Sequence, residues 1–393
     1  MAKPKIRFKG YQDDWEQRKL GEVFRERIER ATGDEELLSV TIAHGVIRQA
    51  DSEKRNIASE DKKNYKVVHH GDVPYNSMRM WQGAVGNSEY CGIVSPAYTV
   101  LIPTQEANGK FFMELFKKEN SLKIFQRWSQ GLTSDTWNLK YPVLSTIEFH
   151  IPNINEQNKI ATYFSHLDLL ITLHQRKCDE AKKLKKFMLQ KMFPQNESRV
   201  PEIRFDGFTD DWEQRKLGEV YAPLTKRNTD LLPYNKILSV ATMTYKTDGN
   251  GAADSSLANY KRLQIGDIAF EGHTSKEFKY GRFVLNDVGD GIMSPRFSAL
   301  RPLIQLPMSF WKYYIHYEPI MCKVLVNSTK AGTMMNELVV DEFLRNFILV
   351  PSKEEQKCIG DTFVSLDSLI TLHQQKCDDL KKLKKYMLQN MFV

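Results

Sequence analysis

A helical stretch that occurs twice is the feature that most constrains the fold of this chain. Residues 152–193 and 351–392 carry the same residue at most positions, and each position recurs 199 residues later. Both copies begin with Pro, continue to a Glu-Gln pair and then run into the sequence LITLHQ. Apolar residues recur at steps of three and four, which predicts in each copy one helix of about 38 residues, ~57 Å long at 1.5 Å per residue.

Both stretches also carry the same helix-start signal. Asn153 stands three residues before Glu156 in the first copy, and Ser352 stands three residues before Glu355 in the second. This spacing is typical of a capping box, in which the first side chain accepts a backbone N–H and the Glu side chain bonds back to the cap residue. We therefore predict that both helices begin here and that both Glu side chains belong to the caps.

Each predicted helix has one long stripe, which we call the seam. Neither helix can bury its seam alone, so the sequence predicts that the two helices pair as an antiparallel coiled coil. The seam comprises Phe164, Leu167, Ile171, His174, Cys178, Ala181, Leu184, Met188 and Met192 in the first copy, and Phe363, Leu366, Ile370, His373, Cys377, Leu380, Leu383, Met387 and Met391 in the second.

Two histidines interrupt the seam near the midpoints of the helices. In an antiparallel pair the midpoints meet, so we predict that His174 and His373 approach each other. Cys178 and Cys377 follow one turn later, which leaves a metal site as an alternative. A polar break that fixes the register of the pair is the interpretation we favour, with no metal bound.

The repeat extends beyond the helices. Residues 6–24 return almost unchanged at 203–221, and Gly-Asp at 71–72 and Ser-Pro at 95–96 return at 266–267 and 294–295. β-rich runs such as 92–102 and 282–300 surround helical stretches at 111–130 and 309–327, the latter interrupted at Pro319, and a last strand precedes each long helix. The predicted fold is α/β: two similar domains (1–151 and 199–350), separated by the antiparallel helices (152–198 with a linker, and 351–393) as a pseudo-two-fold internal repeat.

These landmarks resemble the specificity subunit of type I restriction–modification enzymes over essentially the whole chain. The repeated P-x-x-x-E-Q start and the LD-x-LITLH sequence of the helices carry the most specific part of the likeness. The resemblance implies two target-recognition domains, each reading one half of a bipartite double-stranded DNA target. It further implies that the helices set the spacing and dock two methyltransferase (modification) subunits, which methylate adenine N6.

The resemblance also implies where the cofactors belong. S-adenosylmethionine would be bound by the methyltransferase subunits, and ATP and Mg by separate restriction/translocase subunits, so that this chain would need no cofactor. The sequence agrees with a non-catalytic chain, because it contains no amino-methyltransferase motif of the N-P-P-Y or D-P-P-Y type and no phosphate-binding P-loop. Asp341, Glu355 and Lys357 faintly resemble a nuclease set, but we expect Glu355 to serve as a cap.

Candidate DNA-reading residues lie where the two copies differ. Their side chains can donate to or accept from base edges, or contact phosphates. The candidates are Asn76, Arg79, Trp81, Gln82, Thr133, Ser134 and Asn138 in the first half, and Glu271, His273, Lys276, Lys279, Arg282, Lys330, Thr333 and Asn336 in the second. For the seam and partner docking we name Leu167, Ile171, His174, Leu366, Ile370 and His373.

The identical segments around Trp15 and Trp212 are expected to be structural or partner-facing instead, because two readers of different DNA should differ. Two lysine runs, within 182–186 and 381–385, suit either DNA phosphates or a solvated helix face. The alternative to a DNA-specificity subunit is a non-DNA protein-interaction adaptor built on the long helices.

Charge and composition leave both alternatives open. The net charge of +7 is a mild basic excess. Five cysteines without a CxxC pair, no apolar run of ~20 residues and no signal-peptide pattern predict a cytoplasmic protein that does not contact a membrane.

Overall fold

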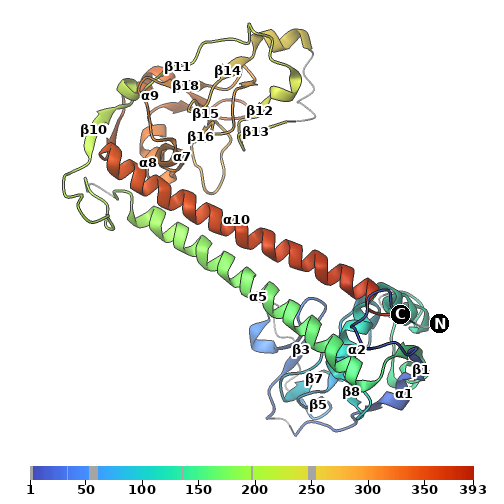
Figure 1. The fold of residues 1–393 in the computed structure, drawn as a ribbon. Coiled ribbons are helices and arrows are strands. Elements are labelled where there is room, and N and C mark those ends of the chain that lie inside the picture. The colour runs from blue at the N-terminus through green and yellow to red at the C-terminus, as the bar shows by residue number, and fades with distance from the viewer. Residues whose placement is uncertain (1–2, 33, 53–60, 135, 196–197, 247–253) are drawn as a thin grey trace. The chain divides into compact units, whose positions relative to one another are not determined.

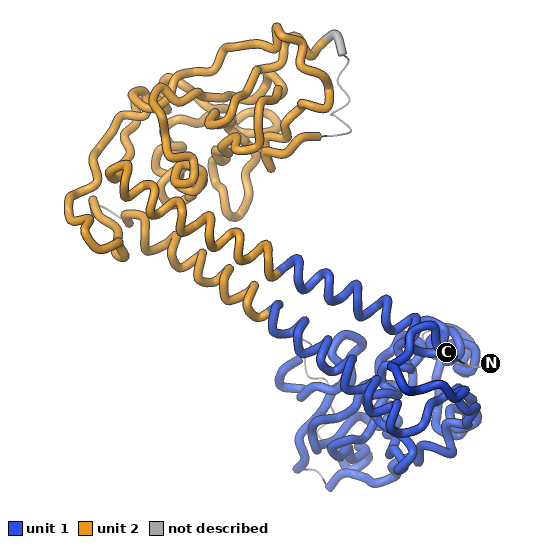
Figure 2. Tube along the Cα trace, in the orientation of Figure 1, with its two compact units in different colours: residues 1–175, 374–393 blue, residues 176–373 orange. Residues whose placement is uncertain are grey.

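The structure divides the chain into two compact units. It is a computed structural model that describes residues 3–32, 34–52, 61–134, 136–195, 198–246 and 254–393 (Figure 1). Unit 1 contains residues 1–175 and 374–393, and unit 2 contains residues 176–373 (Figure 2). Each unit therefore joins one globular part to one half of each long helix, whereas the predicted recognition domains leave the helices out.

The two predicted long helices are present. Helix α5 spans Ile154–Lys191 and helix α10 spans Lys353–Asn390, with 38 residues each, which confirms the predicted length. The two helices pack together, as Figure 1 shows.

Contacts between the helices show that they run antiparallel. In unit 1 the Cys377 Sγ lies 4.0 Å from the Ile171 carbonyl oxygen, and the Lys384 ammonium lies 2.7 Å from the Asp168 carboxylate. Later residues of α10 thus meet earlier residues of α5. In unit 2 the same contacts recur 199 residues away, with the Cys178 Sγ 3.8 Å from the Ile370 oxygen and Lys185 paired with Asp367 at 2.6 Å. The antiparallel prediction is confirmed.

One position of the predicted seam is wrong in both helices. Leu184 and Leu383 are exposed, and the next residues, Lys185 and Lys384, take the half-buried place. The lysines can occupy it because a carboxylate of the other helix neutralises each ammonium. Burial alone would lower the pKa of Lys384, but the carboxylates of Glu114 and Asp168 outweigh burial and raise it.

The predicted helix starts are confirmed only in part. The Asn153 Oδ1 accepts the backbone N–H of Glu156 at 3.1 Å, and the Ser352 Oγ accepts that of Glu355 at 3.2 Å. The Glu side chains, however, do not return to the cap residues, so the prediction of a full capping box is wrong.

Both Glu side chains instead bind an arginine from the start of their own repeat. Glu156 accepts two hydrogen bonds from Arg7, at 2.7 and 2.8 Å, and Glu355 accepts two at the same distances from Arg204. Both carboxylates are almost completely buried. In each pair one guanidinium donates to both oxygens of the carboxylate, so neither oxygen is left without a donor. The faint nuclease set also loses one of its two carboxylates, since Glu355 is engaged with Arg204.

The glutamines that follow explain the repeated Glu-Gln pair. The Gln157 Nε2 donates to the carbonyls of Glu106 and Pro152, and its Oε1 accepts the Asn108 N–H at 2.9 Å. Gln356 likewise donates to the Pro351 carbonyl and accepts from the indole N–H of Trp311. In both units the motif therefore fastens the first turn of a long helix to the globular part.

The globular part of unit 1 is built from antiparallel strands and short helices. A three-stranded sheet has the order β2-β8-β6, and the pairs β1-β9, β3-β4 and β5-β7 lie beside it. The elements are β1 (Glu16–Lys19), α1 (Leu20–Val23), β2 (Phe24–Glu26), β3 (Leu38–Thr41), β4 (Gly45–Arg48), β5 (Lys66–Val68), β6 (Val73–Asn76), β7 (Gly92–Val94), β8 (Tyr98–Pro103), α2 (Gly109–Lys117), α3 (Glu119–Trp128), α4 (Tyr141–Leu144) and β9 (Glu148–Ile151).

Unit 2 repeats this plan. Its main sheet has four antiparallel strands in the order β11-β18-β15-β16, with the pairs β10-β21, β12-β13, β14-β17 and β19-β20. The elements are β10 (Glu213–Lys216), α6 (Leu217–Val220), β11 (Tyr221–Pro223), β12 (Leu238–Ser239), β13 (Thr244–Tyr245), β14 (Lys261–Leu263), β15 (Ile268–Glu271), β16 (Arg282–Leu285), β17 (Gly291–Met293), β18 (Ala299–Pro302), α7 (Met308–Tyr314), α8 (Glu318–Leu325), β19 (Thr329–Lys330), β20 (Glu337–Leu338), α9 (Val340–Arg345) and β21 (Phe347–Val350).

Each unit has an aromatic-rich core that includes the end of one long helix. Trp15 is buried in unit 1 against Phe111 and Phe392, and Trp212 is buried in unit 2 against Phe193 and Phe310. The identical Trp segments are thus structural. Because α5 starts in unit 1 and ends in unit 2, and α10 does the reverse, each core holds the start of one helix and the end of the other.

The Gly-Asp landmarks form a turn before a strand of the main sheet, β6 in unit 1 and β15 in unit 2. Gly71 has a φ of +91°, a conformation that favours glycine. The Asp72 carboxylate that follows accepts the backbone N–H of His69 and two hydrogen bonds from Arg27. In unit 2 the same turn is made by Gly266, also at +91°, and by Asp267 with Arg301.

The helical stretch predicted at 111–130 is broken into two helices. Helix α2 ends at Lys117 and α3 begins at Glu119, because Lys118 adopts an extended conformation. The Lys118 ammonium donates to the carbonyls of Phe392 and Val393, at 2.9 and 2.8 Å, so a partner distant in sequence fixes the break. In unit 2, Pro319 lies in the first turn of α8, where proline is tolerated.

Candidate nucleic-acid interface

In unit 1 the two predicted reading segments lie together. We call residues 76–82 the first loop of unit 1 and the described residues 130–134 and 136–138 the hairpin of unit 1. The Tyr75 hydroxyl donates to the Leu139 carbonyl at 2.9 Å, and the Leu139 N–H donates to the Ser77 carbonyl at 2.8 Å. The rings of Trp81 and Trp137 are in edge contact, with centroids 5.3 Å apart. The structure thus brings both predicted segments to one surface.

The candidate side chains on this surface differ in availability. Arg79 is exposed, and its guanidinium makes no hydrogen bond or ion pair to the described residues. Asn76 accepts the Met78 N–H with its side chain, and Trp81 donates its indole N–H to the Met78 carbonyl. The side-chain oxygen of Asn138 is buried without a hydrogen-bond partner among the described residues. The remaining candidates Gln82, Thr133 and Ser134 are half-buried or exposed.

In unit 2 the equivalent segments also adjoin. We call residues 271–282 the first loop of unit 2 and residues 329–338 the hairpin of unit 2. The Asn336 N–H donates to the Gly272 carbonyl at 2.9 Å, and a Cβ at Gly272 would lie only 2.0 Å from the Asn336 oxygen. Only glycine therefore allows the loop and the hairpin to approach this closely.

Some candidates of unit 2 are engaged inside the unit. The buried Glu271 pairs with His273 and lies 3.7 Å from the Arg282 Nε, and Arg282 also stacks on Phe278 at 5.0 Å. Lys330 pairs with Glu337 at 3.4 Å. By contrast, the candidates Lys276, Lys279 and Thr333 are exposed, and Asn336 is half-buried.

The seam residues lie inside the helix pair. Leu167 and Leu366 are buried, and Ile171, Ile370, His174 and His373 are half-buried. His174 belongs to unit 1 and His373 to unit 2, and their approach remains a prediction.

The lysine runs are divided between two roles. Lys185 and Lys384 are held by carboxylates, whereas the six others within 182–186 and 381–385 are exposed. Within the ranges that the structure describes, no group of three His, Cys, Asp or Glu residues could hold a metal ion. No helix in those same ranges is long and apolar enough to cross a membrane.

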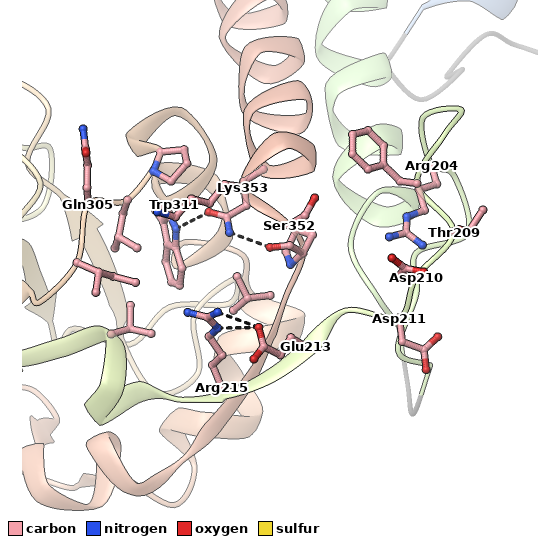
Figure 3. A pocket seen from close by; sticks show the side chains of 18 of the residues that line it. Arg204, Thr209, Asp210, Asp211, Glu213, Arg215, Gln305, Trp311, Ser352 and Lys353 are labelled. Atoms are coloured by element: carbon pink, nitrogen blue, oxygen red, sulfur yellow. Dashed lines mark hydrogen bonds and ion pairs between the residues drawn. The ribbon is translucent and has the colours of Figure 1, made fainter.

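A cavity of about 310 Å³ lies in unit 2, between the repeated segment 204–215 and the beginning of α10 (Figure 3). Arg204, Asp210 and Arg215 line it from the repeated segment, and Trp311 and Ser352 line it from the other side. The segment 204–215 is nearly the same in both halves, so it cannot distinguish two different DNA sequences. The repeated residues that line the cavity are therefore not candidates for reading the bases that differ between half-sites.

Two further sets of exposed apolar side chains were not among the predicted site residues. A second stripe beside the seam consists, on each helix, of two apolar pairs whose partners are three residues apart in sequence, and about three helical turns separate the pairs, a signal that the sequence already contains. It comprises Leu170, Leu173, Leu184 and Phe187 on α5, and Leu369, Leu372, Leu383 and Tyr386 on α10. The other set, Leu132 and Met334, lies in the two hairpins and has no periodic signal.

Comparisons with known proteins agree with this organisation. Residues 12–183 match the family model described as the type I restriction modification DNA specificity domain. The type I restriction enzyme MjaVIII specificity subunit of Methanocaldococcus jannaschii is 22% identical over 353 residues, covering 82% of this chain and 78% of the relative. The putative MjaX specificity subunit of the same organism is 20% identical over 297 residues, covering 71% of this chain and 65% of that protein.

A solved structure has the same fold. The S subunit of a type I restriction–modification system from M. genitalium superimposes with a TM-score of 0.60 at 14% identity, covering 100% of this chain and 99% of that one. The segment that matches the family model ends inside α5, and its landmarks recur in the second half of the chain. Residues 12–183 thus form a type I restriction modification DNA specificity domain, and the chain as a whole is similar to type I restriction–modification specificity subunits.

Proposed function

We propose that each unit reads one block of a bipartite double-stranded DNA target. The observation that carries this proposal is which segments of the two halves are alike and which differ. The helices, the Glu-Arg pairs and the Gly-Asp turns occur twice, whereas the first loop and the hairpin of unit 1 differ in sequence from those of unit 2. A shared framework with different loops suits two readers of two different short sequences.

The recognition domains are residues 1–151 and 199–350, and the DNA-contacting residues are those of the loops and hairpins. Arg79 is the strongest single candidate in unit 1, because an exposed guanidinium without a partner among the described residues can pair with the O6 and N7 of guanine. In unit 2 the exposed Lys276, Lys279 and Thr333 suit phosphate contacts, which position the protein on the duplex.

The second stripe of the helices is the docking face for two methyltransferase subunits. In unit 1 it presents Leu170 and Leu173 of α5 with Leu383 and Tyr386 of α10. Both stripes follow their seam on the same rotational side, so antiparallel pairing places them on one face of the pair. Unit 2 presents the equivalent four side chains, Leu369, Leu372, Leu184 and Phe187, so one kind of partner can bind twice.

In the proposed complex the cofactors belong to the partners. The methyltransferase subunits bind S-adenosylmethionine and methylate adenine N6 after that base leaves the stack. Restriction/translocase subunits use ATP and Mg. This chain supplies sequence recognition, and the helix pair sets the spacing between the two blocks.

Mapping methylated adenines tests the proposal. The chain is co-expressed with a type I methyltransferase subunit in a host that lacks other adenine methylation, and the genome is sequenced for N6-methyladenine. We expect a split motif, with two short specific blocks and a fixed unspecific gap. Exchanging residues 1–151 for those of a relative should change one block only. Methylation without a split motif, or a change in both blocks together, would favour the protein-interaction adaptor.

A further inference from the structure

Each hairpin exposes a large apolar side chain at its end. Leu132 in the hairpin of unit 1 is fully exposed, at 101%, and Met334 in the hairpin of unit 2 is 73% exposed. A leucine left in water forgoes the ~1.5–3 kcal/mol that burial would contribute, so neither side chain assists folding in this state. Leu132 is followed by Thr133 and Ser134, and Met334 stands between Thr333 and Met335.

The hairpin of unit 1 is well anchored at its base. Gln130 and Asn138 exchange two backbone hydrogen bonds, at 3.0 and 2.8 Å, and the Thr136 N–H closes the turn on the Thr133 carbonyl at 2.9 Å. Gly131 has a φ of +152°, and a Cβ there would lie 2.6 Å from the Thr136 oxygen. These contacts fix the position of Leu132 relative to the first loop, because Leu139 is bonded to Ser77.

The hairpin of unit 2 reaches the same result with different residues. Its strands pair Thr329 with Leu338 and Lys330 with Glu337, and Asn336 bonds to Gly272 of the first loop. The Arg296 guanidinium lies 3.9 Å from the Met334 Sδ, which places a positive charge beside the exposed side chain. An apolar tip flanked by a cation and hydroxyl groups suits a duplex, where phosphates border an apolar stack of bases.

We propose that Leu132 and Met334 are wedges, each of which enters the base stack of its own half-site and opens one base step. The inference rests on the proposed function and adds positioning residues to it. An inserted apolar side chain unstacks the bases beside it and kinks the duplex. Unstacking in turn lowers the free energy needed to extrude the neighbouring adenine toward a methyltransferase subunit.

Differences between the two hairpins favour DNA rather than a protein as the partner of these tips. A partner that binds both halves alike would meet the same residues twice, as on the docking face of the helices. The hairpins differ in length, sequence and tip residue, and each lies against the loop that carries the reading candidates of its unit. The tips therefore belong to the surface that differs between half-sites.

The test uses the complete complex of this chain with its methyltransferase subunits and duplexes that carry the mapped motif. 2-Aminopurine, whose fluorescence rises when it is unstacked, is placed at each base step within and beside the two blocks. We expect Leu132→Ser to abolish the fluorescence rise at one step of the block read by unit 1, and Met334→Ser to do so only at the other block. Ile28→Ser is the matched control, since Ile28 is 80% exposed in unit 1 but lies outside the loop and the hairpin.

Unchanged fluorescence in both wedge variants, or the same loss in the control, would overturn the proposal. So would loss of methyltransferase binding without DNA in Leu132→Ser, because that result makes the tip a protein contact. If no split motif exists, the proposed function itself fails. If the motif exists and the fluorescence is unaffected, only the wedges fail.

Discussion

At the scale of single residues, the buried Glu-Arg pairs are interactions that the repeat preserves and whose contribution to stability can be measured. Glu355→Gln removes the charge that balances Arg204, whose pKa is raised by its hydrogen bonds to this carboxylate. Loss of one partner of a fully buried pair costs ~3–5 kcal/mol. The cost should be lower here, because the Arg204 side chain is still 15% exposed to solvent. We expect a loss of about 2–3 kcal/mol in the free energy of unfolding, measured by urea denaturation.

The control for this prediction is the neighbouring residue Glu354, which is exposed in the same first turn of α10. Glu354→Gln should change stability by less than about 0.5 kcal/mol. Equal losses in the two variants would mean that the first turn merely needs negative charge near its N–H groups, and that the pairing with Arg204 adds nothing.

The same residues show what sequence reasoning can reach. Asn153 and Ser352 were predictable as caps, because their partners lie three residues away. The arginines were not, because Arg7 and Glu156 are 149 residues apart and local patterns contain no information on such contacts. The candidate DNA-reading residues are an intermediate case: sequence divergence points to both segments of each unit, but only the fold shows that they adjoin.

At the scale of elements, the docking patches of unit 1 and unit 2 can be tested separately. The double variant Leu170→Ser/Leu173→Ser removes apolar surface from the patch of unit 1 and leaves that of unit 2 intact. We expect native mass spectrometry to show complexes with one methyltransferase subunit instead of two, while the thermal stability of the isolated chain stays the same.

Ile28→Ser is the matched control for the docking face, since Ile28 is 80% exposed in unit 1 but lies outside both long helices. It should leave two methyltransferase subunits bound. Two bound subunits in the double variant, or none, would show that the patches are not separate, equivalent docking sites.

Elements were more predictable than their interruptions. Both long helices follow from periodicity alone, but the seam shifts from Leu184 to Lys185 because an acidic residue of the other helix meets that position. The break at Lys118 likewise depends on main-chain oxygens of Phe392 and Val393, which follow α10. In each case a tertiary partner overrides a preference that is correct for an isolated helix.

At the scale of the whole molecule, the repeat makes each unit complete only with residues from both halves of the chain. The start of α5 packs in unit 1 with the end of α10, and the Ile6 N–H even donates to the Asn390 carbonyl as the Ile203 N–H donates to that of Lys191. The two halves are thus interchangeable parts of one pattern, and a chain with two identical halves should fold.

Such a chain gives the sharpest test of the pseudo-two-fold. Replacing residues 6–193 with a second copy of residues 203–392 keeps the paired lysines and aspartates of the seam, because each occurs in α10 itself. Antiparallel helices relate identical readers by a two-fold axis, and the strands of duplex DNA are related in the same way. We therefore expect genome methylation at an inverted repeat of the block read by unit 2. A direct repeat, or a single block, would mean that the symmetry of the helices does not govern how the two readers meet DNA.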